Sequence, residues 1–468
     1  MLDIVVIGGG PGGYVAALRA ANLGARVALV EARRIGGTCL NRGCIPTKAL
    51  VRSAEVYELA RRAAEFGVVV GEPRLDFARV MARKQQVVDR LVGGVEFLLK
   101  AAGVAVYRGR AAVPRPGVVE VTVAGEDGDS WGSGETGETA ETVERLQTRA
   151  IILATGSRPA LPPVSLESLR LTISSDEALA LREPPERMLI IGGGVLGVEF
   201  ASIYASFGTK VDIVKRTPVI LPPVDEEIAR RMMPLLKKRG VTVHSGIYVR
   251  EVQEIPDGSR RVLARTAAGE EAVFEADQVL VAMGRLPDFG GIDLAALGVR
   301  HGDSGVEVDS RMRTNVPGIY AIGDVTGLYY LASVATAQGL VAAEEACGQG
   351  RDIDYSVVPS CVFSRPEAAS VGLSEREARS RGLDVVVAKF NYGANGKALA
   401  MGEEEGFVKM IARRDDGRVL GVHIMGAGAT DLIHEPAAAM GMGATAEDMA
   451  HLIHAHPTLS ETIMEVAH

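Results

Sequence analysis

Two cysteines, Cys39 and Cys44, lie close together in the stretch GGTCLNRGCIPTKAL, residues 36–50, of a chain with four cysteines in all. The common zinc patterns use two to four intervening residues but need a second pair of ligands. On a regular helix, residues five apart lie roughly 8–9 Å from each other at Cα, whereas a disulfide needs about 4.4–6.8 Å. A disulfide here therefore requires a bend, which Gly43 and Pro46 permit. A bent, strained disulfide is easily reduced, so the spacing favours a working redox pair over the alternative of two unrelated buried thiols.

The residues that follow the cysteines predict a helix that positions them. The segment PTKALVRSAEVYELARR, from Pro46 on, has Leu50, Ala54 and Tyr57 on one face, and proline suits a first helical position. Cys44 then precedes a helix N-terminus, where the dipole favours a thiolate. We expect Cys44 to be the inward thiolate and Cys39, further out on the loop, to be the exposed sulfur that exchanges with substrate.

The C-terminal segment HAHPTLSETIMEVAH supplies a candidate base for such an exchange. It contains His454 and His456, and Glu461 follows the latter by five positions. A dithiol substrate must lose a proton to attack a disulfide, and an imidazole near neutral pH can accept it. A carboxylate on the other ring nitrogen would fix the tautomer. Alternatively, Thr458 and Glu461 form a capping box and Glu461 only caps the last helix; the spacing does not decide between the two.

Two segments, residues 3–31 and 187–215, each contain an apolar run, a Gly-x-Gly-x-x-Gly turn, a periodic helix and a second apolar run. Each predicts a βαβ unit with a dinucleotide site, against the alternative of tight packing alone. The first glycine makes the tight turn, the second lets the backbone approach a pyrophosphate, and the third allows close helix–strand packing. The helix N-terminus then receives the phosphate charge. The glycines are Gly8, Gly10 and Gly13 in the first motif, and Gly192, Gly194 and Gly197 in the second.

The two motifs differ at the end of the second strand. The first ends in Glu31, an acid suited to accept hydrogen bonds from ribose hydroxyls. The second has Lys215 followed by Arg216. We therefore expect one adenosine-type site with a free 2′-hydroxyl, and a second site with positive charge where an acid usually selects NAD.

Three further apolar strands end in glycine turns, at 150–159, 277–287 and 314–325, and the last places Asp324 where it could hold a polyol hydroxyl or simply form the turn. Residues 125–147 are acidic and rich in Gly, Ser and Thr, so we expect a mobile, solvated hairpin loop there. From about residue 347 the chain alternates strand-like runs with Ala-rich helical stretches and lacks a phosphate loop. That pattern predicts a separate α+β domain.

Whole-chain properties limit the class of protein. The 468 residues suffice for two to four domains, and the net charge of −8 argues against general nucleic-acid binding. Apolar runs are too short to cross a membrane, and the N-terminus enters a strand without room for a signal peptide. We expect a cytoplasmic protein, in which a disulfide is catalytic rather than structural.

Taken together, GGTCLNRGCIPTK, the doubled glycine turn, ATGS, YAIGD and HAHPTLSE resemble the pyridine nucleotide–disulfide oxidoreductases, and most closely their lipoamide-oxidising members. The resemblance runs essentially from end to end. It implies an α/β fold with two Rossmann-like dinucleotide-binding domains and a C-terminal α+β dimerisation domain. The implied division is an FAD-binding domain at 1–157, an NAD(P)-binding domain at 158–277, a central domain at 278–346 and an interface domain at 347–468.

The resemblance also implies the cofactors, the site residues and the partners. Non-covalent FAD is expected at Gly8, Gly10, Gly13, Glu31, Thr38, Lys48, Gly156, Asp324 and Ala332. NAD is expected at Gly192, Gly194, Gly197, Glu199, Lys215, Arg216, Val249 and Gly284. Lys48 and Glu199 would pair beside the flavin. Cys39, Cys44, His456 and Glu461 would be catalytic, with His456 and Glu461 acting across a homodimer interface, and no metal is expected. The expected partner is the lipoyl domain and acyltransferase core of a 2-oxo acid dehydrogenase complex.

Some residues depart from the lipoamide-oxidising pattern. Lys215 stands where NAD-dependent members have an acid, and Arg216 matches NADPH-dependent relatives that reduce glutathione disulfide. The motifs CIPTK and HAHPTLSE favour the lipoamide branch over those relatives. An NADPH-dependent disulfide reductase therefore remains the alternative, and NADP is not excluded as the nucleotide. Asp288 and Ser333, where the family commonly has Asn and His, are departures without an interpretation.

Overall fold

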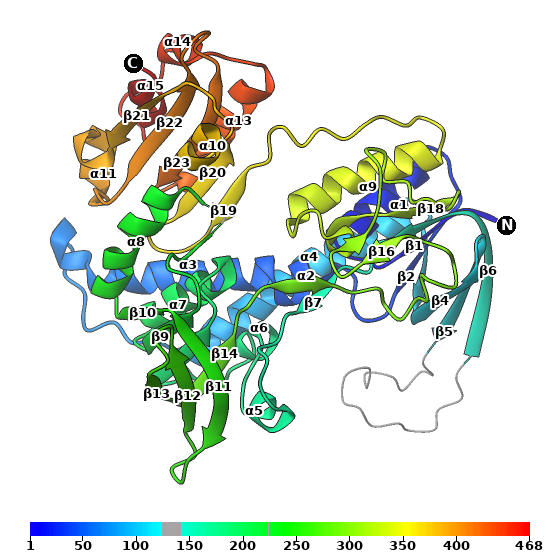
Figure 1. The fold of residues 1–468 in the computed structure, drawn as a ribbon, viewed down its shortest axis with the longest axis horizontal. Coiled ribbons are helices and arrows are strands. Elements are labelled where there is room, and N and C mark those ends of the chain that lie inside the picture. Colours follow the sequence, from blue (N-terminus) through cyan, green and yellow to red (C-terminus); the bar gives the residue numbers. More distant parts are fainter. Residues whose placement is uncertain (124–141, 223) are drawn as a thin grey trace. The chain divides into compact units, whose positions relative to one another are not determined.

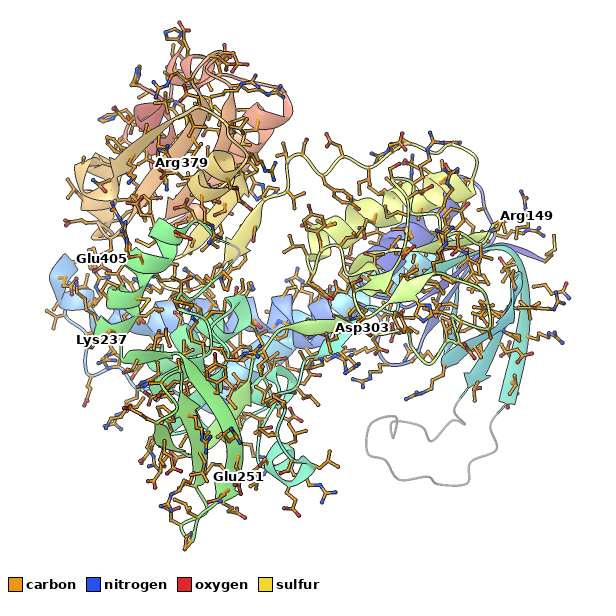
Figure 2. The ribbon with its side chains drawn as sticks, viewed as in Figure 1. Arg149, Lys237, Glu251, Asp303, Arg379 and Glu405 are labelled. Carbon is orange, nitrogen blue, oxygen red and sulfur yellow. The ribbon has the colours of Figure 1, made fainter. Side chains whose placement is uncertain are left out.

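The computed structural model describes residues 1–123, 142–222 and 224–468 (Figure 1). The chain folds into two compact units, and the division falls within helices α3 (Cys44–Arg61) and α4 (Phe77–Ala101). Unit 1 comprises residues 1–49, 81–160 and 285–354, and unit 2 comprises residues 50–80, 161–284 and 355–468. Charged side chains such as Arg149, Lys237 and Glu251 are exposed at the surfaces of the units (Figure 2). Among the described residues, no helix combines the length and the apolar character needed to cross a bilayer.

Unit 1 is built on a sheet in which β3, β2, β1, β6 and β18 are parallel neighbours. The strand β6 is long enough to do two things: its second half pairs with β1 and β18, and its first half forms an antiparallel ladder with β5, which pairs in turn with β4. The strands of the sheet are β1 (Leu2–Ile7), β2 (Val27–Glu31), β3 (Ala105–Arg108), β4 (Arg110–Arg115), β5 (Val118–Val123), β6 (Thr142–Leu153) and β18 (Ile319–Ala321).

The β5–β6 ladder bears on the acidic segment predicted as a loop over 125–147. Residues 142–147 are paired with β5, so the prediction is wrong for this part of the segment. These residues are the first half of β6, and most of their side chains are polar and exposed. The sequence therefore lacks the alternation of apolar and polar residues that would have predicted a strand. The remainder of the predicted loop, up to residue 141, lies outside the described residues.

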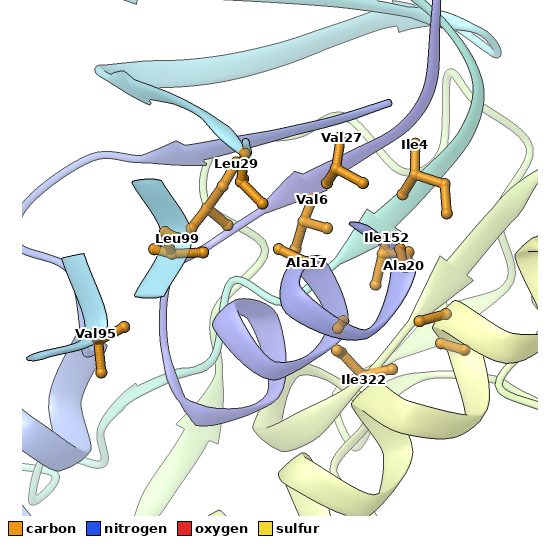
Figure 3. Packing of buried hydrophobic residues seen from close by; sticks show 14 of the residues in the cluster. Ile4, Val6, Ala17, Ala20, Val27, Leu29, Val95, Leu99, Ile152 and Ile322 are labelled. Carbon is orange, nitrogen blue, oxygen red and sulfur yellow. The ribbon is translucent and has the colours of Figure 1, made fainter. Parts of the chain in front are cut away.

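Helix α1 (Pro11–Asn22) covers the parallel part of this sheet and packs on α9 (Ala332–Ala346). Small residues allow the two helices to approach closely, since a Cβ on Gly339 would stand 2.4 Å from the carbonyl oxygen of Gly12. The core beneath α1 contains Ile4, Val6, Leu29 and Ile152 from the sheet (Figure 3). The other elements of unit 1 are α2 (Gly37–Arg42), β7 (Ser157–Pro159), β15 (Arg285–Pro287), β16 (His301–Gly302), β17 (Gly305–Val306) and the 3₁₀ helix η2 (Gly323–Thr326).

Unit 2 contains a second parallel sheet, in the order β10-β9-β8-β14, with helix α7 packed against it. A three-stranded antiparallel sheet, β11-β12-β13, is formed by the chain between β10 and β14. The elements are α5 (Leu166–Arg170), α6 (Ser175–Ala178), β8 (Arg187–Ile191), α7 (Val195–Ser206), β9 (Lys210–Lys215), α8 (Glu226–Lys238), β10 (Val241–Ser245), β11 (Ile247–Glu254), β12 (Arg260–Thr266), β13 (Glu271–Ala276) and β14 (Gln278–Val281).

The C-terminal part of unit 2 has a five-stranded antiparallel sheet, β19-β20-β23-β22-β21, with short helices around it. This arrangement confirms the predicted α+β fold of the C-terminal part, while its separateness as a domain stays a prediction. Its elements are β19 (Ser360–Val362), β20 (Ala368–Gly372), α10 (Glu375–Ser380), β21 (Val385–Asn391), η3 (Tyr392–Ala394), α11 (Gly396–Met401), β22 (Phe407–Arg413), β23 (Val419–Met425), α12 (Ala429–Leu432), α13 (His434–Gly441), α14 (Ala446–Ala450) and α15 (Glu461–Ala467); η1 (Ala63–Phe66) follows α3.

Candidate active site

The paired cysteines lie on two different helices. Cys39 belongs to the short helix α2, and Cys44 is the first residue of α3. The chain changes direction at Gly43 between them, where a Cβ would stand only 3.0 Å from the carbonyl oxygen of Thr38. The bend expected at Gly43 is present, whereas Pro46 lies inside α3. The predictions that Cys39 is on a loop and that the helix starts at Pro46 are wrong, because the turn at Gly43 is tight enough for helices to form on both sides.

Both cysteines are thiols in this structure, and their side chains hydrogen-bond to each other. That hydrogen bond, followed by burial, raises the pKa of the Cys39 thiol, while the nearby charge of Lys48 opposes the rise. Cys39 and Cys44 are both half-buried, and Cys39 packs against the core of unit 1. The expectation of an exposed Cys39 is therefore wrong for this conformation. The role expected of Cys44 as the thiolate of the pair stays a prediction.

The first glycine turn has the geometry that a dinucleotide site requires. Gly8 has φ +107°, and a Cβ there would stand 2.2 Å from the carbonyl oxygen of Ala154. A Cβ on Gly13 would stand 1.8 Å from the carbonyl oxygen of Gly8, so only glycine lets α1 approach β1 this closely. Gly10 caps α1 without a side-chain hydrogen bond and leaves its first N–H groups available to an anion.

Two half-buried carboxylates belong to the same part of unit 1. Glu31 accepts hydrogen bonds from the backbone N–H groups of Gly9, at 2.7 Å, and Arg33, at 2.8 Å. Asp324 lies in η2, the turn after β18. Burial raises the pKa of both carboxyl groups, and the hydrogen bonds only partly offset it. Each carboxylate has lost water without gaining a full set of donors, as expected of groups that receive hydroxyls from a ligand.

The remaining residues predicted for the first site are distributed through unit 1. Thr38 lies in α2 and Lys48 in α3. Gly156 has φ +81° in the turn after β6. Ala332 opens α9, whose N-terminus has no side-chain cap. All of them therefore fall in the unit that contains the cysteine pair.

Sequence reasoning missed two residues that hold Asp324. Ser157 donates from Oγ to Asp324 Oδ2 at 2.5 Å. Arg285 donates from Nε to the Ser157 hydroxyl at 2.6 Å and from Nη2 to the Ser157 carbonyl at 2.7 Å. Ser157 and Arg285 lie on β7 and β15, which pair antiparallel although they are 128 residues apart. The only sequence signal was that both residues follow strand-ending glycines.

The second glycine turn, in unit 2, repeats the first. Gly192 has φ +123°, and its Cβ would stand 2.2 Å from the carbonyl oxygen of Ala282. A Cβ on Gly197 would stand 2.1 Å from the carbonyl oxygen of Gly192. Gly194 caps α7 without a side-chain hydrogen bond, and nothing lies within 4 Å of its Cβ position. The N-terminus of α7 is thus open to a phosphate group.

The cations at the end of β9 take different positions. Lys215 is buried, its Nζ hydrogen-bonds to the carbonyl of Thr217, and its Cδ would be 2.8 Å from a Cβ on Gly193. Burial lowers the pKa of Lys215. Arg216 is exposed. Of the two predicted cations, Lys215 therefore points inward with a backbone partner, and Arg216 faces solvent.

Three other residues predicted for the nucleotide site lie in unit 2. Glu199 is on α7, is 3% exposed, and accepts a hydrogen bond from the backbone N–H of Phe363 at 2.9 Å. Val249 is in β11, at an irregularity of the β11–β12 ladder. Gly284 has φ +103° after β14. The pairing of Lys48 with Glu199 joins residues of different units and stays a prediction.

The tail residues His456 and Glu461 are in contact. His456 Nδ1 lies 2.8 Å from Glu461 Oε1, and the other carboxylate oxygen accepts from the backbone N–H of Thr458 at 2.7 Å. These contacts, the Thr458 N–H first, lower the pKa of Glu461. The histidine–carboxylate contact expected of a base is present, whereas the capping box is not: α15 begins at Glu461 with Ser460 as its N-cap and no side-chain cap, and the Thr458 hydroxyl donates to the carbonyl of Ala455. The His456 side chain is 80% exposed.

Comparison with known proteins places this geometry in a family. The family model for pyridine nucleotide-disulphide oxidoreductases matches residues 2–339, and the model for their dimerisation domain matches residues 358–467. The chain belongs to the pyridine nucleotide-disulphide oxidoreductase family. Members of this family are FAD-dependent oxidoreductases that use a pyridine nucleotide.

Curated relatives in this family match nearly the whole chain. A dihydrolipoyl dehydrogenase of Bacillus subtilis (strain 168) is 41% identical, with 99% of this chain and 97% of that protein covered. One of Geobacillus stearothermophilus is also 41% identical, with 99% and 95% covered. Among solved structures of the family, the Cu(II) complex of the HOCl-induced flavoprotein disulfide reductase RclA from Escherichia coli gives a TM-score of 0.86 at 28% identity, covering 100% of this chain and 98% of that one.

Proposed function

We propose that the chain is a dihydrolipoyl dehydrogenase, the E3 component of a 2-oxo acid dehydrogenase complex, which oxidises protein-bound dihydrolipoamide and reduces NAD. The observation that carries the proposal is the mutual hydrogen bond of Cys39 and Cys44 across the bend at Gly43. It lies in the unit that contains the first glycine turn. The full-length identity to proteins named dihydrolipoyl dehydrogenase supports the choice of substrate.

The residues of each glycine turn fit one cofactor. When bound, FAD would supply an acceptor for the electron pair of the reduced cysteine pair and a hydride donor to NAD. In unit 1, the open N-terminus of α1 would hold pyrophosphate, and the half-buried carboxylates of Glu31 and Asp324 would hold hydroxyls. The full set for FAD is Gly8, Gly10, Gly13, Glu31, Thr38, Lys48, Gly156, Asp324 and Ala332. The set for NAD is Gly192, Gly194, Gly197, Glu199, Lys215, Arg216, Val249 and Gly284.

In the oxidised enzyme, Cys39 and Cys44 form a disulfide, and a thiolate of dihydrolipoamide attacks the sulfur of Cys39. The Cys39–Cys44 bond breaks, a mixed disulfide forms, and Cys44 leaves as a thiolate at the N-terminus of α3, where the helix dipole stabilises it. The second sulfur of the substrate then attacks the substrate sulfur that is bonded to Cys39. The bond to Cys39 breaks and Cys39 is released. The result is lipoamide as a cyclic disulfide and a reduced cysteine pair, so two electrons have moved from substrate to protein.

His456 is the proposed base that takes the proton of the attacking thiol. Its Nδ1 faces the Glu461 carboxylate, so Nδ1 carries the hydrogen and Nε2 is left to accept a proton. The exposed position of His456 suits a group that meets a substrate presented from outside its own chain.

The proposed domain division is 1–157 for FAD, 158–277 for NAD(P), 278–346 as the central domain and 347–468 as the interface domain. The dimerisation-domain match supports a homodimer. We further propose that His456 and Glu461 of one subunit act on the cysteine pair of the other, and that the enzyme docks to an acyltransferase core. A cytoplasmic location fits a cysteine pair that must be reduced and reoxidised.

One observation favours a second candidate, an NADPH-dependent disulfide reductase. No carboxylate stands at the end of β9 to accept hydrogen bonds from a ribose diol, and the exposed Arg216 could meet a 2′-phosphate. The two functions differ in both substrate and nucleotide.

Steady-state kinetics would separate the two candidates. We expect kcat/KM for dihydrolipoamide with NAD to exceed that for glutathione disulfide with NADPH. Cys39→Ser should lower the lipoamide reaction at least about a thousandfold, because no disulfide can form. Cys347→Ser, which changes a half-buried thiol at the end of α9, serves as the matched control and should leave the rate intact. Faster turnover of glutathione disulfide with NADPH would overturn the assignment.

A further inference from the structure

A second histidine, His454, anchors the segment that carries His456. Residues 451–460 between α14 and α15 form neither helix nor strand. The neighbours on both sides are exposed: Ile453 is 100% exposed, and His456 is 80% exposed at its side chain. The side chain of His454, in contrast, is only 9% exposed. Among residues 451–457 it is therefore the one residue that is not exposed, whereas residues 458–460 are half-buried.

Both ring nitrogens of His454 face groups that can only accept hydrogen bonds. Nε2 lies 2.8 Å from Glu435 Oε1, on α13, and Nδ1 lies 3.1 Å from the carbonyl oxygen of Leu452. A neutral imidazole carries one N–H, so it could satisfy one of these acceptors and would present a lone pair to the other. Only the imidazolium, with two N–H groups, makes both hydrogen bonds.

We propose that His454 is a fixed imidazolium that positions the catalytic segment, holding it to α13 through Glu435 while His456 remains free to exchange protons. This inference rests on the proposed role of His456. The chain thus contains two histidine–carboxylate pairs two residues apart with opposite tasks. His456 offers a second nitrogen to the substrate, whereas His454 uses both nitrogens in the protein.

The charged groups around His454 support this state. Burial by itself would lower the pKa of His454, but the hydrogen bonds to Glu435 and to Leu452 outweigh burial, and the charge of Glu461 adds to them, so the pKa is raised. His454 in turn is one of the positive charges that lower the pKa of Glu461. On the other side of His456, Asn395 Nδ2 donates to the carbonyl of Thr458 at 3.0 Å. The segment is therefore held before and after His456.

The protonation state can be tested without any substrate. In the ¹⁵N-histidine-labelled holoenzyme at pH 7.5, above the ordinary imidazole pKa of about 6.5, the signals lost in His454→Gln identify His454. We expect one-bond N–H correlations from both of its ring nitrogens. A single protonated nitrogen at that pH would overturn the proposal, whatever the enzyme's substrate is.

The positioning role can be tested with the pH profile of the dihydrolipoamide reaction. His454→Gln removes the cation and leaves Glu435 uncompensated, so it should move the acidic limb of the pH profile of kcat/KM upward by roughly 0.5–1 pH unit. The misplaced base should also lower kcat roughly tenfold. Reduction of ferricyanide by NADH, which needs no thiol base, should stay within about twofold.

His451→Gln is the matched control, since it removes an exposed histidine from the same segment, three residues away. It should change neither the profile nor kcat. An unshifted profile in His454→Gln, or an equal effect of His451→Gln, would contradict the positioning role. Absence of lipoamide turnover in the wild type would instead contradict the proposed function and leave the protonation test standing.

Discussion

The two glycine turns of this protein have the same backbone and different chemistry. In each, the first glycine has a positive φ, and a side chain there would meet a carbonyl 2.2 Å away, that of Ala154 in unit 1 and that of Ala282 in unit 2. In each, the third glycine lies against the carbonyl of the first. This geometry serves any pyrophosphate, because backbone N–H groups and a helix N-terminus hold the charge.

The difference lies in the residue that ends the second strand. Glu31 turns toward the glycine loop and accepts from the N–H of Gly9. Lys215 crosses the corresponding Gly193, and its ammonium bonds to the carbonyl of Thr217. The first turn therefore has a half-buried acid beside it, whereas the second has the aliphatic carbons of Lys215 beside it and the exposed Arg216 next in the chain. If both turns bind a dinucleotide as proposed, this one side chain is the difference that would decide which ribose each turn prefers.

The largest expected effect comes from replacing the third glycine of each turn with alanine. Gly13→Ala places a Cβ 1.8 Å from a backbone oxygen, so α1 must move and FAD should be lost. Gly197→Ala makes a 2.1 Å clash in the other turn and should leave FAD bound while NADH no longer reduces it. Flavin absorbance per protein and the rate of bleaching by NADH measure the two outcomes.

Gly93→Ala is the control for these variants, because this glycine lies inside α4 with nothing within 4 Å of its Cβ position. It should retain both functions and raise the free energy of unfolding by roughly 0.5–1 kcal/mol. If Gly197→Ala also lost FAD, the two turns would not be the independent sites that the comparison assumes.

An intermediate effect is expected when the second turn receives the residue type of the first. Lys215→Glu provides a carboxylate that can accept from Gly193 and from a ribose diol, as Glu31 does beside Gly9. The ratio of kcat/KM for NADH to that for NADPH should rise roughly tenfold. Lys210→Glu, the same charge change at the exposed start of β9, should leave the ratio unchanged. An unchanged ratio in Lys215→Glu would mean that this position does not select the nucleotide.

The smallest effect concerns the charge of Glu31. Burial raises the pKa of this carboxyl group above its ordinary value, so it takes up a proton at a higher pH than a surface glutamate. As pH falls toward that raised pKa, the ribose loses an anionic acceptor and FAD should dissociate more readily. Glu31→Gln should weaken FAD roughly three- to tenfold at pH 7.5 and remove this part of the pH dependence.

Equilibrium dialysis between pH 5 and 8 measures the loss of FAD affinity in the wild type and in Glu31→Gln. Glu96→Gln, on the surface of α4, is the control and should follow the wild type. A wild-type affinity that does not change over this range would show that Glu31 is already fully ionised at pH 5.

The sequence determined the features that depend on local sterics. The glycine turns, the bend at Gly43 and the helix beyond Cys44 were all predictable, because each depends on residues within a few positions of one another. The fold class was predictable from two βαβ patterns and from a C-terminal third in which strand-like runs alternate with helical stretches. The contact of His456 with Glu461 was visible as one of two alternatives within a span of six residues.

Tertiary structure decided where the charged side chains went. Lys215 turned inward across Gly193 rather than toward solvent, and Glu199 accepts a hydrogen bond from the backbone N–H of Phe363, 164 positions away. Arg285 reached Ser157 from 128 positions away through the pairing of β7 and β15. Such partners are supplied by chain packing, since a buried charge adopts whichever position satisfies its hydrogen bonds, and no spacing in the sequence records which one that is.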